Sequence, residues 1–141
     1  MSDIIYPRSP RETMCGWAHL PRLIDKIRLH LAGKLHADYQ ENYGKGFDSQ
    51  LLETAGLTLE ELATVVQNSI TDGQVADWVA NRVKKSDCEK RAHAEGMFNR
   101  PAPGDATGTA RLAQRKEQAG IAHRDDIRFF VDLIDVDEKR R

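Results

Sequence analysis

Several features that would mark a specialised class of protein are scarce or missing in this sequence. Only two cysteines occur in 141 residues, which excludes a scaffold built on disulfides and fits a reducing compartment. No apolar run approaches the roughly 20 residues that span a bilayer. The first residues carry no basic and apolar signal segment. We therefore expect a cytoplasmic protein that does not enter a membrane.

The sequence also has no excess of charge of either sign. The chain carries 21 basic and 22 acidic residues, for a formal charge of −1. The whole chain thus has no field that would attract nucleic acid. The basic spots have acids between them and no aromatic companions, so we interpret them as solvated helix faces and expect no nucleic-acid partner. These spots are Lys84–Lys85, Lys90–Arg91, and Arg111 with Arg115 and Lys116.

What the chain does contain is a globular balance, 40% hydrophobic and 30% charged, in the length of one ordinary domain. No alternating run predicts a pair of strands. Signals that begin helices recur instead, and a capping box opens at each of Ser9, Thr58, Thr71 and Ser86. We predict an all-α, single-domain irregular bundle (residues 1–141) of seven or eight short helices.

Several boundaries follow from the same signals. The Ser9 box predicts a short helix that ends near Gly16, and Asp48 and Asp125 are expected to cap later helices. Leu57 and Ile70 precede two of the boxes and predict hydrophobic staples. We expect residues 1–8 to form an extended arm, residues 99–105 a Pro/Gly loop, and residues 106–136 C-terminal helices that pack as an arm.

We predict one further helix, at about residues 21–32, and expect it to be the central helix of the bundle. It begins with a proline in its first turn and stops at a glycine. Its apolar residues share one arc of about 100°, while Leu29 lies on the far side between Arg22 and Lys26. A helix that is apolar on two sides is covered on two sides, so both cations are expected at sheltered positions. The residues of the main arc are Leu20, Leu23, Ile24, Ile27 and Leu31.

Four stretches of the chain resemble a known family. They are Pro7–Pro10, His19–Lys26, Gly44–Asp48 and Arg124–Ile127. These runs are similar to a bacterial family of domains of unknown function, numbered five thousand and sixty-nine. The resemblance covers nearly the whole chain and implies a small bacterial cytoplasmic protein. It implies no activity, ligand or catalytic residue.

A cluster of charges on and beside the central helix is the main candidate site. Asp25 lies three residues from both Arg22 and Arg28, so one carboxylate could bridge two guanidinium groups. One interpretation is a ladder of ion pairs that anchors the N-terminal segment and Asp48 to the helix. The alternative is an anion pocket for a phosphate or carboxylate, which requires two cationic tips that converge on open space. Its candidate residues are Arg8, His19, Arg22, Lys26, His30 and Lys45.

Two other patterns are weaker. The run Gly44–Asp48 precedes a helix start, where free N–H groups favour an anion, but it lacks the spacing of a P-loop. We prefer to interpret it as a tight turn into a capped helix. The aromatic residues near the central helix could line a groove, but we favour a role in the core and in staples; they are Trp17, Tyr39, Tyr43 and Phe47.

Metal and nucleophile chemistry find little support. Cys15 and His19 are four residues apart and Cys88 and His93 five apart, which matches no usual zinc spacing. A Cys15–His19 dyad would require a thiolate stabilised by nearby cations. We therefore predict no metal, no cofactor and no catalytic residue.

Two functions of different classes remain. The first, which we favour, is a non-catalytic binding or interaction module that self-associates through its last helix. Phe129 and Phe130 are adjacent there and cannot both face one core. The second is a small enzyme or sensor that acts on an anionic metabolite, held by Arg22 and Lys26, with His19 or His30 as the acid–base group.

Overall fold

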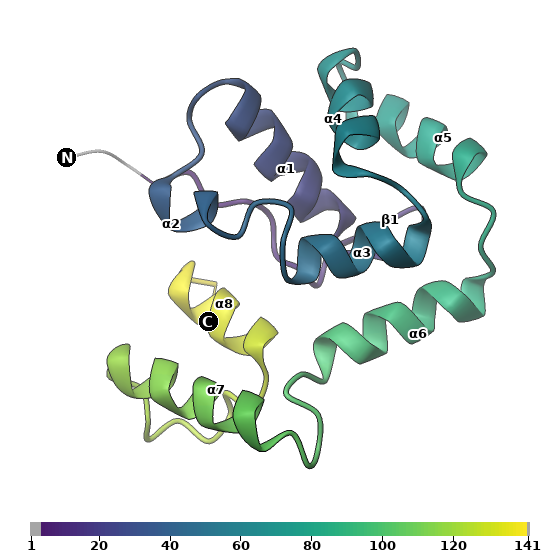
Figure 1. The fold of residues 1–141 in the computed structure, drawn as a ribbon. Helices are drawn as coiled ribbons and strands as arrows, with labels where there is room; N and C mark the ends of the chain where they lie inside the picture. Colours follow the sequence, from purple (N-terminus) through teal and green to yellow (C-terminus); the bar gives the residue numbers. More distant parts are fainter. Residues whose placement is uncertain (1–3, 141) are drawn as a thin grey trace. The chain divides into compact units, whose positions relative to one another are not determined.

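The computed structural model describes residues 4–140, and the described residues are mostly helical, as predicted. They also contain a hairpin of two very short strands, β1 (Thr13–Met14) and β2 (Trp17–Ala18). The helices, shown in Figure 1, are α1 (Leu20–Leu31), α2 (Ala37–Gln40), α3 (Phe47–Ala55), α4 (Leu59–Gln67), α5 (Asp72–Arg82), α6 (Asp87–Phe98), α7 (Ala106–Gln118) and α8 (Phe130–Asp137). No helix among these residues is both long enough and apolar enough to cross a bilayer.

The described residues divide into two compact units, the first ending at Ala94 and the second beginning at Glu95. The boundary thus lies within α6, not in the loop predicted at residues 99–105. The grouping into one domain and the packing of residues 106–136 as an arm stay predictions. Residues 4–8 form neither helix nor strand, while residues 1–3 of the predicted arm lie outside the described residues.

The core of the first unit is built around α1. This helix packs against α4 and the hairpin, and its apolar arc is buried together with residues of α3, α4 and α5. The prediction was wrong for Leu31, which is 47% exposed because the segment 30–34 is exposed as a whole. Leu29 on the far side is half-buried, and Arg22 and Lys26 are buried, as the two-sided helix predicted.

The hairpin replaces the helix that the Ser9 box predicted, and that prediction was wrong. The Ser9 hydroxyl accepts from the backbone of Arg11 and not from Glu12. Cys15 and Gly16 then take positive φ values of 44° and 86°, so the chain turns back on itself. Two successive left-handed residues suit a tight hairpin turn and cannot continue a helix.

The later capping boxes are confirmed. The side chains of Thr58 and Thr71 accept from the backbone three residues on, with the reciprocal bond present in both boxes. Ser86 and Glu89 exchange the same pair of bonds. These caps form because both partners lie within one turn of chain, where spacing alone brings them together.

The staple predicted at Ile70 is wrong. Its side chain is 89% exposed, whereas Val75, the expected partner, is fully buried. The chain enters α5 with the Ile70 backbone N–H bonded to Gln74 Oε1, and this bond fixes the entry without an apolar contact. Leu57, the other staple residue, is buried in the core.

We therefore expect Ile70→Thr to leave stability nearly unchanged, within about 0.5 kcal/mol, because no apolar contact is lost. Leu57→Ala is the matched comparison and should cost about 2–5 kcal/mol, as burial of a leucine demands. Urea unfolding followed by circular dichroism measures both. Equal losses for the two variants would restore the staple at Ile70.

Two predicted caps are displaced. α3 begins at Phe47 with Gly46 as its N-cap, so Asp48 lies inside the first turn and is fully buried. α8 begins at Phe130, and Asp125 does not cap it. The carboxylate of Asp132 accepts the backbone N–H groups of Arg128 and Phe129 instead, so the helix starts one turn later.

The second unit has a small core of its own. Residues of α7, α8 and the segment between them form it: Leu112, Ile127 and Leu133, with Ile121, Phe130 and Val136 packed against them. The guanidinium of Arg115 lies over the Phe130 ring at 5.9 Å. Phe129 is half-buried and does not belong to this core.

Candidate functional site

Three polar side chains meet in the interior of the first unit, and we call them the polar core. His19 is 1% exposed, Lys26 5% and Asp48 fully buried. His19 Nε2 lies 2.5 Å from Asp48 Oδ1, and Lys26 Nζ lies 3.2 Å from Asp48 Oδ2. Lys26 lies on α1, His19 is the N-cap of that helix and Asp48 lies on α3, so the polar core joins the two helices.

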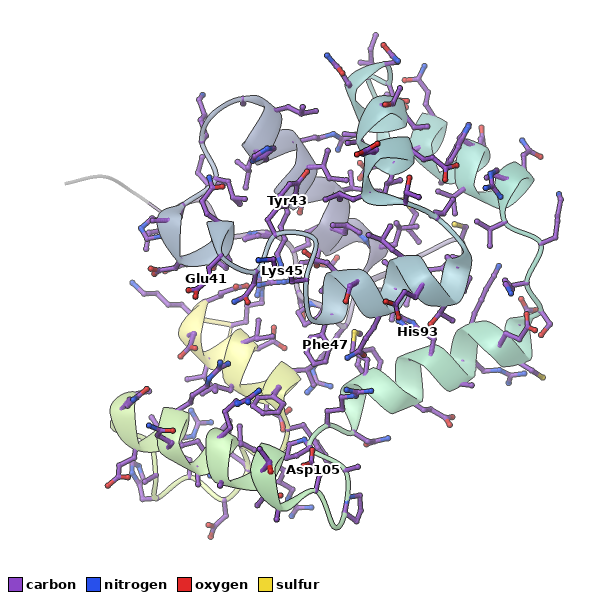
Figure 2. The ribbon with its side chains drawn as sticks, viewed as in Figure 1. Glu41, Tyr43, Lys45, Phe47, His93 and Asp105 are labelled. Carbon is purple, nitrogen blue, oxygen red and sulfur yellow. The ribbon has the colours of Figure 1, made fainter. Side chains whose placement is uncertain are left out.

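The loop before α3 aims Asp48 inward. Gly44 and Gly46 both take positive φ, which glycine adopts without strain, and the turn between them leaves Lys45 exposed. The Gly44 backbone N–H donates to Asp48 Oδ2 at 3.0 Å. Figure 2 shows Tyr43, Lys45 and Phe47 along this loop into α3. The anion held by this glycine turn is therefore the chain's own carboxylate.

The charges within the polar core follow from burial and pairing. Burial lowers the pKa of His19, although the hydrogen bond to Asp48 opposes this effect, so the imidazole is neutral near pH 7. Burial would raise the pKa of Asp48, but the bond from His19 and the charge of Lys26 outweigh it and hold the pKa below its ordinary value. Asp48 is thus ionised, and His19 donates from Nε2 while Nδ1 carries the free lone pair.

His19 combines this bond with an unusual backbone. As N-cap of α1 it has φ 72°, a left-handed conformation that costs a non-glycine residue about 1–3 kcal/mol. Its Nδ1 is buried and has no hydrogen-bond partner. A carboxylate that orients an imidazole is an arrangement used in acid–base catalysis. Here, however, the free nitrogen faces the interior, so only a group that enters the core could exchange a proton with it.

A second group of charges, the outer ion pairs, lies at the surface of the same unit. Arg8 binds Asp25 at 2.9 Å and Asp72 at 2.8 Å, and Arg28 binds Asp72 at 2.5 Å. Asp25 thus pairs with Arg8, and Arg28 with Asp72, both outside α1. The predicted bridge from Asp25 to Arg22 and Arg28 stays a prediction. Burial alone would raise the pKa of Asp72, but Arg28 and Arg8 hold it below its ordinary value.

Two further candidate residues, Arg22 and His30, have other surroundings. Arg22 donates to the backbone carbonyl of Arg8 at 3.1 Å, and its guanidinium lies 5.6 Å from the centre of the Tyr39 ring. His30 is exposed and stacks on Tyr43 with ring centres 4.4 Å apart. The candidate residues are therefore divided among the interior, the outer ion pairs and the solvent-facing surface.

Metal and thiol chemistry gain no support from the geometry. Within the described residues, no three His, Cys, Asp or Glu side chains gather as ligands of a metal ion. Burial raises the pKa of the Cys15 thiol despite the nearby charge of Lys90, which is the opposite of what an activated thiolate requires. Cys88 is exposed. Trp17 is buried in the core and Tyr43 packs against it, in keeping with the interpretation of the aromatic residues as core.

Sequence reasoning missed Asp72 as a partner of the arginines, and it weighed His93 only as a metal ligand together with Cys88. Asp72 was interpreted only as part of a capping box, yet it binds Arg28 from 44 residues away. His93 lies edge-on to the Trp17 ring at 5.7 Å. No local spacing connects these residues with their partners, so only the fold reveals the contacts.

Gly44 offers a test of the turn that places Asp48. A Cβ at Gly44 would lie 2.7 Å from Leu59 Cδ2, and its φ of 74° is strained for any other residue. We expect Gly44→Ala to cost about 1–3 kcal/mol from backbone strain, with the Leu59 contact in addition. Gly56→Ala is the control, because Gly56 has φ 76° and open space around it. Thermal unfolding compares them, and an equal loss would show that the Leu59 contact contributes nothing.

These observations define a small, predominantly helical protein whose first unit encloses a histidine–aspartate–lysine cluster. A family model described as "Domain of unknown function (DUF5069)" matches residues 4–140. The chain therefore belongs to this family, and the resemblance seen in the sequence is confirmed. No curated protein matches the chain.

Proposed function

We propose that the protein is a non-catalytic binding module, in which the buried charges hold the first unit in shape. One observation supports this proposal: two of the cations that the sequence predicted to bind an anion, Lys26 and Arg8, form ion pairs with carboxylates of the chain itself. Lys26 ends on Asp48, and Arg8 ends on Asp25 and Asp72. A cation already paired in this way has little affinity left for an external phosphate or carboxylate.

The partner we propose is a second copy of the chain, bound through the start of α8. Phe130 packs on the core of the second unit, whereas its neighbour Phe129 does not belong to that core. A half-buried phenylalanine that the core leaves out supplies apolar surface for association. Symmetric association of two copies would bring both Phe129 side chains into one contact.

Sedimentation velocity tests this partner. We expect the wild-type protein to sediment as a dimer or larger oligomer, and Phe129→Ser to shift it towards the monomer. His123→Ser, at an exposed position in the same unit, is the control and should leave the distribution unchanged. A wild-type protein that stays monomeric at high concentration would overturn self-association.

A second candidate function is a small enzyme or sensor of an anionic metabolite. One observation favours it: the buried Nδ1 of His19 has no partner and lies in the same cluster as Lys26. A ligand at about 100 times its dissociation constant stabilises a protein by roughly 2.7 kcal/mol. Thermal shifts with phosphorylated and carboxylate metabolites therefore separate the two functions. The binding module predicts no shift, whereas a shift that His19→Gln abolishes would favour the second candidate.

We also propose a cytoplasmic location in a bacterial cell. The free thiols of Cys15 and Cys88 fit a reducing compartment. Fractionation of cells that produce the protein at its natural level tests this placement. Recovery with a periplasmic or membrane fraction would contradict it.

A further inference from the structure

The first half of α6 makes few packing contacts with the rest of the first unit. Its residues 87–94 are exposed except for Lys90, His93 and Ala94, which are half-buried. Among the described residues, no member of α6 belongs to the buried apolar core of the first unit. A polar helix of this length is marginal on its own, because helix stability in proteins comes mostly from packing. Its position therefore depends on a few specific contacts.

Those contacts are made with the hairpin, and we call them the latch. Lys90 Nζ donates to the backbone carbonyl of Cys15 at 2.9 Å and lies 6.0 Å from the centre of the Trp17 ring. His93, one turn further along α6, meets the same indole edge-on at 5.7 Å with the rings at 68°. Trp17 itself is buried, so the latch joins α6 to the core through one side chain. Figure 2 labels His93 on α6.

The two ring nitrogens of His93 are buried and have no hydrogen-bond partner. A neutral imidazole already leaves one donor and one acceptor unsatisfied there. A protonated ring would leave two donors unsatisfied and add a buried charge, which costs considerably more. The groups that face it offer no hydrogen-bond acceptor: Trp17 presents its indole ring, whose N–H only donates, and Lys90 is a cation.

The next groups outward give no relief either. The charge of His19 opposes a proton on His93, and Asp48, the carboxylate that binds His19, is already bound by Lys26 and the Gly44 backbone. The Cys15 thiol is a neutral group. Protonated His93 would thus meet cations and apolar surface.

We propose that His93 makes the latch acid-sensitive, so that its protonation releases the first half of α6 from the hairpin. Burial lowers the pKa of His93, and the neighbouring His19 lowers that pKa further. The docked helix therefore binds the proton more weakly than the released helix does. The latch is fully closed above the ordinary histidine pKa of about 6.5 and weakens as the pH falls below it.

Hydrogen exchange measured by NMR tests the proposal, with rates corrected for the intrinsic effect of pH. We expect the opening of α6 at residues 90–94 to become roughly tenfold more frequent for each pH unit below about 6.5, until His93 is protonated in the docked state as well. The amides of α4 should keep their protection over this range. Loss of protection in α4 and α6 together would indicate global unfolding and overturn a local latch.

Variants identify the group that titrates. His93→Gln and His93→Phe cannot be protonated, and in either of them the exchange of α6 should no longer depend on pH. The phenylalanine variant also keeps a ring against Trp17, so it remains informative if the glutamine variant releases α6 at every pH. His123→Gln is the control and should behave as the wild type. Persistence of the pH dependence in His93→Phe, or its removal only by His19→Gln, would overturn the proposal.

Discussion

Replacing Asp48 by alanine should lower the free energy of unfolding by about 3–5 kcal/mol, because it leaves the buried Lys26 ammonium without its carboxylate. The same change removes the acceptor for His19 Nε2 and for the Gly44 N–H. Buried donors that lose their acceptor add their own desolvation cost to the variant. Urea unfolding followed by circular dichroism measures the loss.

Two further variants serve as comparisons for Asp48→Ala. Asp48→Asn keeps the shape and one acceptor oxygen but loses the charge, so we expect a smaller loss than with alanine. Glu53→Ala changes an exposed acid on the same helix and should stay within about 0.5 kcal/mol of the wild type. If Asp48→Ala costs no more than Glu53→Ala, the polar core does not stabilise the first unit.

Replacing Trp17 by alanine should cost a similar amount, about 3–5 kcal/mol, as is typical of a buried aromatic residue. Trp17 is 1% exposed and belongs to the core of the first unit. It also provides the ring that Lys90 and His93 of α6 contact, so the variant removes these contacts as well. Guanidinium unfolding gives the loss, and hydrogen exchange should report faster opening of α6.

The comparison variants for this residue are Trp17→Phe and Trp78→Ala. The phenylalanine keeps most of the packing and an aromatic ring for His93, so its loss should be clearly smaller. Trp78 is only half-buried and packs at the margin of the core, which predicts a smaller loss than for Trp17. A larger loss at Trp78 would mean that the hairpin contributes less to this core than its burial indicates.

The features that could be predicted from the sequence are those whose partners lie within one turn of chain. The boxes at Thr58 and Thr71 are of this kind, because an acceptor and a donor three residues apart meet whenever the helix forms. The burial of Arg22 and Lys26 was also predictable, since apolar residues on both sides of α1 require cover on both sides. The spacing of apolar residues along a helix thus predicts which positions are buried, although it does not predict which residues cover them.

The rest depends on contacts that spacing does not encode. Asp48 has the residue type and position of an N-cap. Its carboxylate is instead buried and binds His19 and Lys26, which lie 29 and 22 residues away in the sequence. Ser9 has a capping box as good as that of Thr58, but the left-handed residues at Cys15 and Gly16 turn the chain into a hairpin. Tertiary packing overrides local preference at both positions.

In the candidate site, too, the sequence predicted the residue types but not their long-range contacts. The sequence placed Lys26, His19 and Asp48 among the residues of interest but also grouped them with His30 and Lys45, which the structure leaves at the surface. Charge on a helix face reveals that cations are present, and it does not reveal which carboxylate each cation meets. Asp72, which binds two arginines, became visible only in the fold.

A double-mutant cycle on Lys26→Met and Asp48→Ala tests the central claim most directly, namely that these two buried groups stabilise the first unit as a pair. We predict that the double variant loses about 1–3 kcal/mol less than the sum of the two single losses, because removing both partners leaves no unpaired buried charge. Losses that add to within about 0.5 kcal/mol would show that the two charges act independently, and would contradict the account.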